Sequence, residues 1–247
     1  PQPSHRRTMV VWQGCVQPAL APGINCAAAR VLDRLGISLI PAKSGCCGAI
    51  SLHMGMWDEA QQFMRKAIDS LWHHVNAGAE AIVVTSSGCG MHLREYGELL
   101  ADDPAYREKA QRVSSLVRDV AEVITTEWAP GQPPEVIQRE ETRITFQAPC
   151  SLQHGEKLGG VVEALLRRTG YKVLPVAYGF TCCGAAGSYK LFQPKIAEQL
   201  RQQKLKTLVT GRAELIATAN IGCLTHLAAA SPLPVYHWLE LLDARLK

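Results

Sequence analysis

Eight of the nine cysteines in this 247-residue chain form one pattern that occurs twice. Each half has a lone cysteine, then a Cys-Cys-Gly turn, then a Gly-Cys-x-x-His segment. Thiolates bind zinc and iron–sulfur clusters and also form reversible disulfides, so the pattern indicates metal or redox chemistry. The eight residues are Cys15, Cys46, Cys47 and Cys89 in the first half, and Cys150, Cys182, Cys183 and Cys223 in the second.

The two halves repeat at a nearly constant distance. The offset is 150 − 15 = 135 for the lone cysteine, 182 − 46 = 136 for the pair and 223 − 89 = 134 for the last. The surrounding residues repeat as well, because SGCCGAI at 44–50 resembles FTCCGAA at 180–186. Self-similarity at a fixed period indicates a duplicated structural unit. We predict two tandem lobes related by a pseudo-twofold axis: a first repeat over 1–128, a Pro- and charge-rich linker over 129–142 and a second repeat over 143–247.

Short apolar segments alternate with segments of helical spacing in both halves. We expect strands at 8–13, 37–40 and 81–85, and again at 144–147, 171–175 and 215–219. Helices are expected at 27–35, 56–76 and from about 91, then at 160–168 and 194–209. The segments 117–124 and 235–242 repeat each other and close the two halves. Such alternation predicts an α/β fold with parallel sheets.

Every cysteine of the pattern falls just past the end of an expected strand. The carboxyl ends of parallel strands share one edge of the sheet, where ligands bind, so the four thiols of each half should meet in one crevice. Cys89 and Cys223 are expected to precede helix starts, where the helix dipole favours thiolate. Cys26 lies outside the pattern and is expected to pack within a helix.

The residue types leave alternatives open for these thiols. Structural zinc favours Cys-x-x-Cys, which this sequence lacks, and two adjacent cysteines fit different irons of a larger cluster more easily. A vicinal dithiol that cycles through a disulfide is another redox use. His92 and His226 lie one helical turn after a cysteine, and His154 lies four residues after Cys150. We expect all three to orient ligands rather than bind metal, because cysteine is the usual iron–sulfur ligand.

Composition and missing motifs exclude several functions. The net charge of 26 − 22 = +4 is dispersed, so nucleic acid is not an expected partner. No apolar run reaches the ~20 residues of a membrane span. The sequence has no G-x-G-x-x-G loop for a flavin or nicotinamide phosphate, and no signal peptide is visible at its start, so we expect a cytoplasmic protein. It begins with Pro1 and not Met, so we expect a fragment, a processed form or a trimmed form of a protein.

The doubled pattern resembles the cysteine-rich CCG domain, which occurs in heterodisulfide reductase B subunits, lactate-utilisation proteins and the iron–sulfur subunit of glycolate oxidase. The stretches GCVQPALAP, AGAEAIVVTSSGCG, APCSLQHGEKL and TCCGAAGSY are most similar to the C-terminal half of the last. The resemblance covers essentially the whole chain. It implies that the eight cysteines hold one or two iron–sulfur clusters of the 4Fe-4S type.

The resemblance also implies a role and partners. Flavin-containing glycolate oxidase subunits would carry the FAD and oxidise glycolate to glyoxylate. This chain would pass the electrons to quinone or another acceptor, in the cytoplasm or peripherally at the inner membrane, and would not be catalytic alone. Two other functions stay open: a heterodisulfide reductase-like thiol oxidoreductase, and a non-catalytic zinc-binding or assembly module.

Two features depart from the relatives. The full glycolate oxidase subunit has an N-terminal ferredoxin-like region with two Cys-x-x-Cys-x-x-Cys-x-x-x-Cys-Pro runs, and this sequence has none. The heterodisulfide reductase pattern ends in Cys-x-x-Cys, whereas here a histidine takes the last place, at His92 and His226. Each site therefore has four cysteines.

Overall fold

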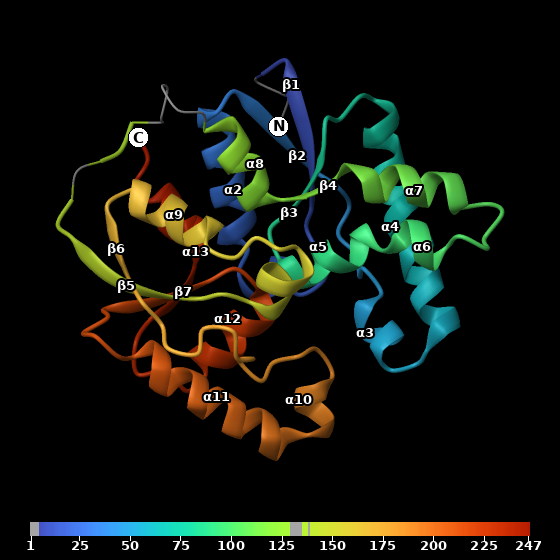
Figure 1. Ribbon diagram of the computed structural model, residues 1–247. Helices are drawn as coiled ribbons and strands as arrows, with labels where there is room; N and C mark the ends of the chain where they lie inside the picture. The colour runs from blue at the N-terminus through green and yellow to red at the C-terminus, as the bar shows by residue number, and fades with distance from the viewer. Residues whose placement is uncertain (1–4, 129–134, 138) are drawn as a thin grey trace. The chain divides into compact units, whose positions relative to one another are not determined.

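Residues 5–128, 135–137 and 139–247 are described by the computed structural model, and the chain divides into two compact units (Figure 1). Unit 1 ends at Glu127 and unit 2 begins at Trp128. Each unit contains a four-stranded sheet in which every strand pair is parallel, which confirms the predicted α/β class with tandem lobes. Most of the predicted linker lies outside the described residues, and the domain boundaries given above stay predictions.

Unit 1 has the strand order β2-β1-β3-β4, so its first strand lies inside the sheet. Figure 1 shows α2 and α8 on one face of this sheet and α4 and α7 on the other. The strands are β1 (Arg7–Trp12), β2 (Ile37–Pro41), β3 (Ile82–Val84) and β4 (Val117–Asp119). The helices are α1 (Gln17–Leu20), α2 (Gly23–Arg34), α3 (Ala49–His53), α4 (Trp57–Asn76), α5 (Ser87–Arg94), α6 (Tyr96–Leu99), α7 (Arg107–Leu116) and α8 (Val120–Glu127).

Unit 2 repeats this topology with the order β6-β5-β7-β8. In Figure 1, α9 and α13 cover one face of its sheet and α11 covers the other. The strands are β5 (Thr142–Gln147), β6 (Tyr171–Leu174), β7 (Leu215–Thr218) and β8 (Val235–His237). A π-helical turn, η1 (Ser151–Gly155), follows β5, and the helices are α9 (Val161–Arg168), α10 (Tyr189–Phe192), α11 (Pro194–Leu208), α12 (Ile221–Ala228) and α13 (Trp238–Asp243).

The longest helix, α4, shows why these segments fold as they do. Its apolar residues recur at helical spacing, and Ala60, Met64 and Leu71 of this face are fully buried. Asp58 and Glu59 lie in the first turn, where the helix dipole favours acidic side chains. Among the helices of the described ranges, none combines the length and the apolarity that crossing a membrane would need.

The fourth strand of each sheet was not predicted. The segments 117–124 and 235–242 each begin with a three-residue strand and run directly into a helix. The side chain at the junction caps that helix: Asp119 Oδ1 accepts from the Ala121 amide at 2.7 Å, and His237 Nδ1 accepts from the Leu239 amide at 3.3 Å. Strands this short carry no periodic signal of their own.

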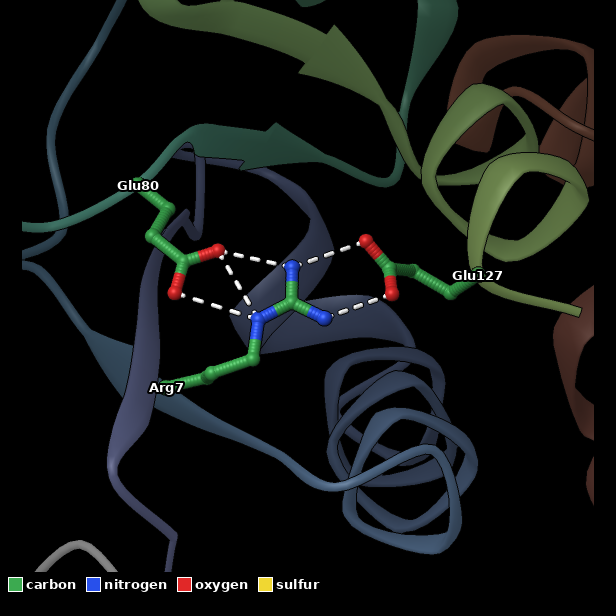
Figure 2. A network of polar contacts seen from close by, with 3 residues as sticks. All are labelled: Arg7, Glu80 and Glu127. Carbon is green, nitrogen blue, oxygen red and sulfur yellow. Dashed lines mark hydrogen bonds and ion pairs between the residues drawn. The ribbon is translucent and has the colours of Figure 1, made fainter.

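An ion-pair network joins the start of β1 to two other segments of unit 1 (Figure 2). The Arg7 guanidinium donates to Glu80, at 2.7 Å from Nη2 to Oε2, and to Glu127, at 2.6 Å from Nη1 to Oε2. Glu80 precedes β3 and Glu127 ends α8. The hydrogen bonds from Arg7 lower the pKa of Glu127.

Candidate metal centre

The four cysteines of unit 1 lie together at the carboxyl edge of its sheet, as predicted. Cys15 follows β1, Cys46 and Cys47 follow β2, and Cys89 follows β3. The Cys47 thiol donates to Cys89 Sγ at 3.7 Å, and the side chains of Cys15 and Cys46 are hydrogen-bonded. Cys15 is exposed, whereas Cys47 is only 5% exposed, so the site extends from the surface into the core.

Unit 2 gathers its four cysteines in the same way. The Cys183 thiol donates to Cys223 Sγ at 3.1 Å, and Cys150 is hydrogen-bonded to Cys182. Cys183 and Cys223 are buried, and Cys150 and Cys182 are half-buried. The structure thus brings together the predicted thiols in both units. Their role as iron–sulfur ligands stays a prediction.

The last cysteine of each site lies inside a helix, which corrects the sequence prediction. The helix of Cys89, α5, begins at Ser87 and not near Met91, and α12 begins at Ile221. Cys89 and Cys223 are each the third residue of their helix. Glycines beside both cysteines lower the helix propensity and conceal this first turn in the sequence. The position still lies at the positive end of the helix dipole.

Within each site, thiols that donate a hydrogen bond have a raised pKa and thiols that accept one have a lowered pKa. Hydrogen bonds from Cys15 and Cys47 lower the pKa of Cys46, and the hydrogen bond from Cys47 lowers the pKa of Cys89. The pKa of each donor thiol is raised in turn, with burial adding to the rise. The lowered pKa values of Cys46 and Cys89 shift these two groups toward thiolate, the form that binds metal. In unit 2 the pKa is lowered at Cys182 and Cys223 and raised at Cys150 and Cys183.

The glycine of each Cys-Cys-Gly turn is required by backbone geometry. Gly48 has φ +92° and Gly184 has φ +89°, a region that side chains rarely adopt. A Cβ at Gly184 would lie 2.3 Å from the Ala197 carbonyl oxygen, and one at Gly48 would lie 2.9 Å from that of Ala60. The amide of each glycine donates to the first cysteine of its turn, at 3.4 Å for Gly48 and 3.3 Å for Gly184. The turn thus presses against a helix and presents an N–H group to sulfur.

In each unit a hydrogen bond between buried polar side chains joins the segments at the ends of the two central strands, which precede the first and the last cysteine of the site. In unit 1, Gln17 Nε2 donates to Thr85 Oγ1 at 2.6 Å and thereby joins the loop of Cys15 to the end of β3. In unit 2, Thr218 Oγ1 donates to Gln147 Oε1 at 2.6 Å, which joins β7 to β5. These hydrogen bonds fix the spacing of the segments that carry the first and the last cysteine of each site before any ligand binds.

The histidines occupy three different environments. His92 is 1% exposed, interacts electrostatically with Cys46 and lies 3.6 Å from Glu95, measured from Nδ1 to Oε2. His226 lies against the Cys-Cys-Gly turn of unit 2, because its Nε2 would be 3.2 Å from a Cβ at Gly184. His154 is exposed in η1. That these residues orient ligands stays a prediction.

Three residues near the sites were not found from the sequence, and the expectation for Cys26 was wrong. The Tyr96 hydroxyl donates to the Cys47 carbonyl oxygen at 2.6 Å, and Asn220 Nδ2 donates to Cys223 Sγ at 3.7 Å. Lys204 of α11 is 1% exposed and interacts electrostatically with all four cysteines of unit 2. In the sequence, the position of Lys204 on the apolar face of a predicted helix already indicates that this lysine is buried. Cys26 is exposed on α2 and is not packed in the core.

The donor set fits a metal group bound by sulfur. Each site offers four thiols, two of them favouring thiolate, and a backbone N–H directed at sulfur, which is the environment of iron–sulfur and zinc–thiolate sites. Within the described ranges, no three Cys, His, Asp or Glu side chains already surround a point suited to one metal ion.

Comparison with known proteins identifies the class. The model of the cysteine-rich CCG domain matches residues 9–94 and again 144–228, which is most of the chain. The chain therefore belongs to the family of proteins built from this domain, and the predicted resemblance is confirmed.

Individual relatives are consistent with this family. The glycolate oxidase iron-sulfur subunit of Escherichia coli K12 is 44% identical over 245 residues, which cover 98% of this chain and 59% of that protein. The chain thus spans about three fifths of that relative. Lactate utilization protein A of Bacillus licheniformis is 27% identical over 94% of this chain and 97% of that protein. Among solved structures, a putative Asp/Glu racemase from Yersinia pestis has a TM-score of 0.33 at 13% identity, over 96% of this chain and 95% of that one.

Proposed function

We propose that this chain is the electron-transfer part of the iron–sulfur subunit of a flavin-dependent glycolate dehydrogenase complex, and that each four-cysteine site holds a cluster of the 4Fe-4S type. The observation that carries the proposal is the gathering of four thiols at the same sheet edge in both units. A cluster bound there accepts and releases one electron at a time. The name of the E. coli relative supplies the iron–sulfur class and the hydroxy-acid substrate.

The residues of this chain hold and tune such a cluster. Cys46, Cys89 and their equivalents favour thiolate, and the amides of Gly48 and Gly184 donate to sulfur and offset negative charge. Cys15 is exposed, so one edge of the first site is within reach of a docked redox partner.

The electron balance requires partners. Oxidation of glycolate to glyoxylate releases two electrons and two protons, and the sequence has no loop for binding a flavin phosphate. Flavin subunits would therefore take both electrons from the substrate and pass them singly to this chain, and a quinone or similar acceptor would receive them. A membrane-bound quinone favours a complex that lies in the cytoplasm and associates peripherally with the inner membrane.

Anaerobic purification followed by spectroscopy tests the proposal. We expect broad visible absorbance that bleaches on reduction, together with about eight iron atoms per chain when both sites are filled. Cys223→Ala should lose about half of the iron, whereas Cys26→Ala should keep all of it, because Cys26 is exposed and outside both sites. Equal iron in the two variants would contradict the assignment of ligands.

The same sample separates the other functions. Stoichiometric zinc without visible absorbance would indicate a zinc-binding or assembly module. Reduction of a disulfide substrate by the iron-loaded chain would indicate a heterodisulfide reductase-like enzyme. We expect no glycolate oxidation by the chain alone, and activity only when flavin subunits and a ferredoxin-like region are added. Substantial turnover by the isolated chain would refute the electron-transfer role.

A further inference from the structure

One buried lysine distinguishes the second site from the first. Lys204 lies on the inner face of α11 with Ala197 and Leu208, and only 1% of it is exposed. A lysine so fully buried is rare, because removing its charge from water is costly. Its ammonium group donates to the Gly179 carbonyl oxygen at 2.7 Å, and no carboxylate of the described residues forms an ion pair with it.

The inner face of α11 packs against the cysteines of unit 2. Leu205, the residue after Lys204, belongs to the same buried cluster as Cys183 and Cys223. The Lys204 ammonium group is held by Gly179, three residues before Cys182. Burial lowers the pKa of Lys204, and the cysteines of unit 2 oppose that shift by favouring its charged form. The lysine therefore lies beside the metal site and has no acidic partner among the described residues.

In unit 1, which the structure describes from residue 5 on, the equivalent helix position carries no charge. The two Cys-Cys-Gly turns press against equivalent helix positions, Ala60 and Ala197, which differ by 197 − 60 = 137. By that offset, Lys204 corresponds to 204 − 137 = 67, and residue 67 is an alanine that is 1% exposed. The basic side chain that acts on Cys46 in unit 1 is the imidazole of His92, which lies on a different helix, α5.

We propose that Lys204 makes the two sites electrochemically unequal: its buried charge stabilises negative charge at the second site, so a cluster there accepts an electron more readily than one in unit 1. This inference rests on the proposed function. Reduction adds one electron to a cluster that already carries cysteinate charge, and a nearby cation favours that reduced form. The flavin subunits supply the electron, and at equilibrium the first electron to enter the chain resides in unit 2.

Redox titration of the full chain, followed by electron paramagnetic resonance, tests the proposal. In the wild type the two clusters should titrate at different potentials. Cys223→Ala, which removes the cluster of unit 2, should leave the one of lower potential. If the remaining cluster has the higher potential, or if the two clusters titrate together, the proposal is wrong. This comparison needs no change at Lys204 and so does not depend on the folding of a Lys204 variant.

Substitution of Lys204 then tests whether its charge causes the difference in potential between the two clusters. Lys204→Gln keeps a donor for Gly179 but removes the charge. At a fixed potential it should lower the ratio of reduced to oxidised cluster in unit 2 about tenfold, which is ~59 mV for one electron, and leave unit 1 unchanged. Lys206→Gln on the same helix is the matched control, because Lys206 is exposed. An unchanged potential in Lys204→Gln with full iron would show that the lysine only holds the loop at Gly179.

Failure of the proposed function gives a different result. Absence of iron from the anaerobic wild-type chain refutes the cluster assignment of both sites. Full iron with a single shared potential refutes the inference about Lys204 and leaves the cluster assignment standing.

Discussion

Replacing Gly184 by alanine tests whether the Cys-Cys-Gly turn is held by its contact with α11. The new Cβ would lie 2.3 Å from the Ala197 carbonyl oxygen, so backbone atoms must shift. Gly187 provides a matched control three residues along, because its φ is also positive, at +57°, and nothing lies within 4 Å of a Cβ there. The two variants therefore share the conformational penalty and differ in the steric one.

The expected loss of unfolding free energy follows from this difference. Gly187→Ala pays only for a left-handed conformation, about 1–2 kcal/mol. Gly184→Ala pays the same penalty plus overpacking of about 1–3 kcal/mol, for a total of about 2–5 kcal/mol. Moving the turn also displaces Cys182 and Cys183, so Gly184→Ala should lose the iron of unit 2 and keep that of unit 1.

Urea unfolding and iron analysis of the two variants measure these losses. Trp128 and Trp238, both 1% exposed, report the unfolding of unit 2 by fluorescence. The extra loss of about 1–3 kcal/mol, divided by a slope of about 2 kcal/mol per molar urea, should lower the midpoint of Gly184→Ala by about 0.5–1.5 M relative to Gly187→Ala. Equal midpoints and equal iron content in the two variants would refute the steric explanation.

Two further expectations concern the thiols and the ion pairs. His226→Ala should keep the iron that Cys223→Ala loses and change the iron affinity by about 10–100-fold at most, as measured by chelator competition; equal loss from both variants would make His226 a ligand. Glu127→Gln should lower the unfolding free energy by about 0.5–1 kcal/mol at pH 7, since its partner Arg7 is partly exposed. Because the folded-state pKa of Glu127 is lowered, this contribution is present above its ordinary pKa of 4.5 and is lost as the pH falls through the folded-state value. Urea midpoints of the two proteins, measured from pH 7 down through the acid range, test this, and a difference that does not shrink as the pH falls would contradict the ion-pair origin.

The site could be predicted from the sequence because its geometry follows from topology. Parallel strands end at one edge, so cysteines placed after three strands must meet there. The helix α4 was predicted within one residue of its start because its apolar positions are strongly periodic. These features depend on local patterns that the fold preserves.

The remaining features depend on tertiary contacts. The three-residue strands β4 and β8 form because a neighbouring strand pairs with them, and they carry no alternation of their own. The start of α5 was missed because Gly88 and Gly90 are poor helix formers, although the fold holds them in the first turn. The position of Lys204 on the apolar face of α11 is visible in the sequence, but the sequence does not show that this face packs against the cysteines of unit 2.

The inner position of β1 and β5 also has a consequence for synthesis on the ribosome. In each unit the first strand made is an inner strand, and the last cysteine emerges well after the others, 89 − 47 = 42 residues later in unit 1. At about 5–20 residues per second, the first three thiols are made about 2–8 s before the fourth. During this time they can form disulfides with other thiols. The edge strand β4 can then complete the sheet before any cysteine of unit 2 leaves the exit tunnel. We expect iron to enter the two sites in the order of translation, so that nascent chains stalled with unit 1 outside the exit tunnel already bind it.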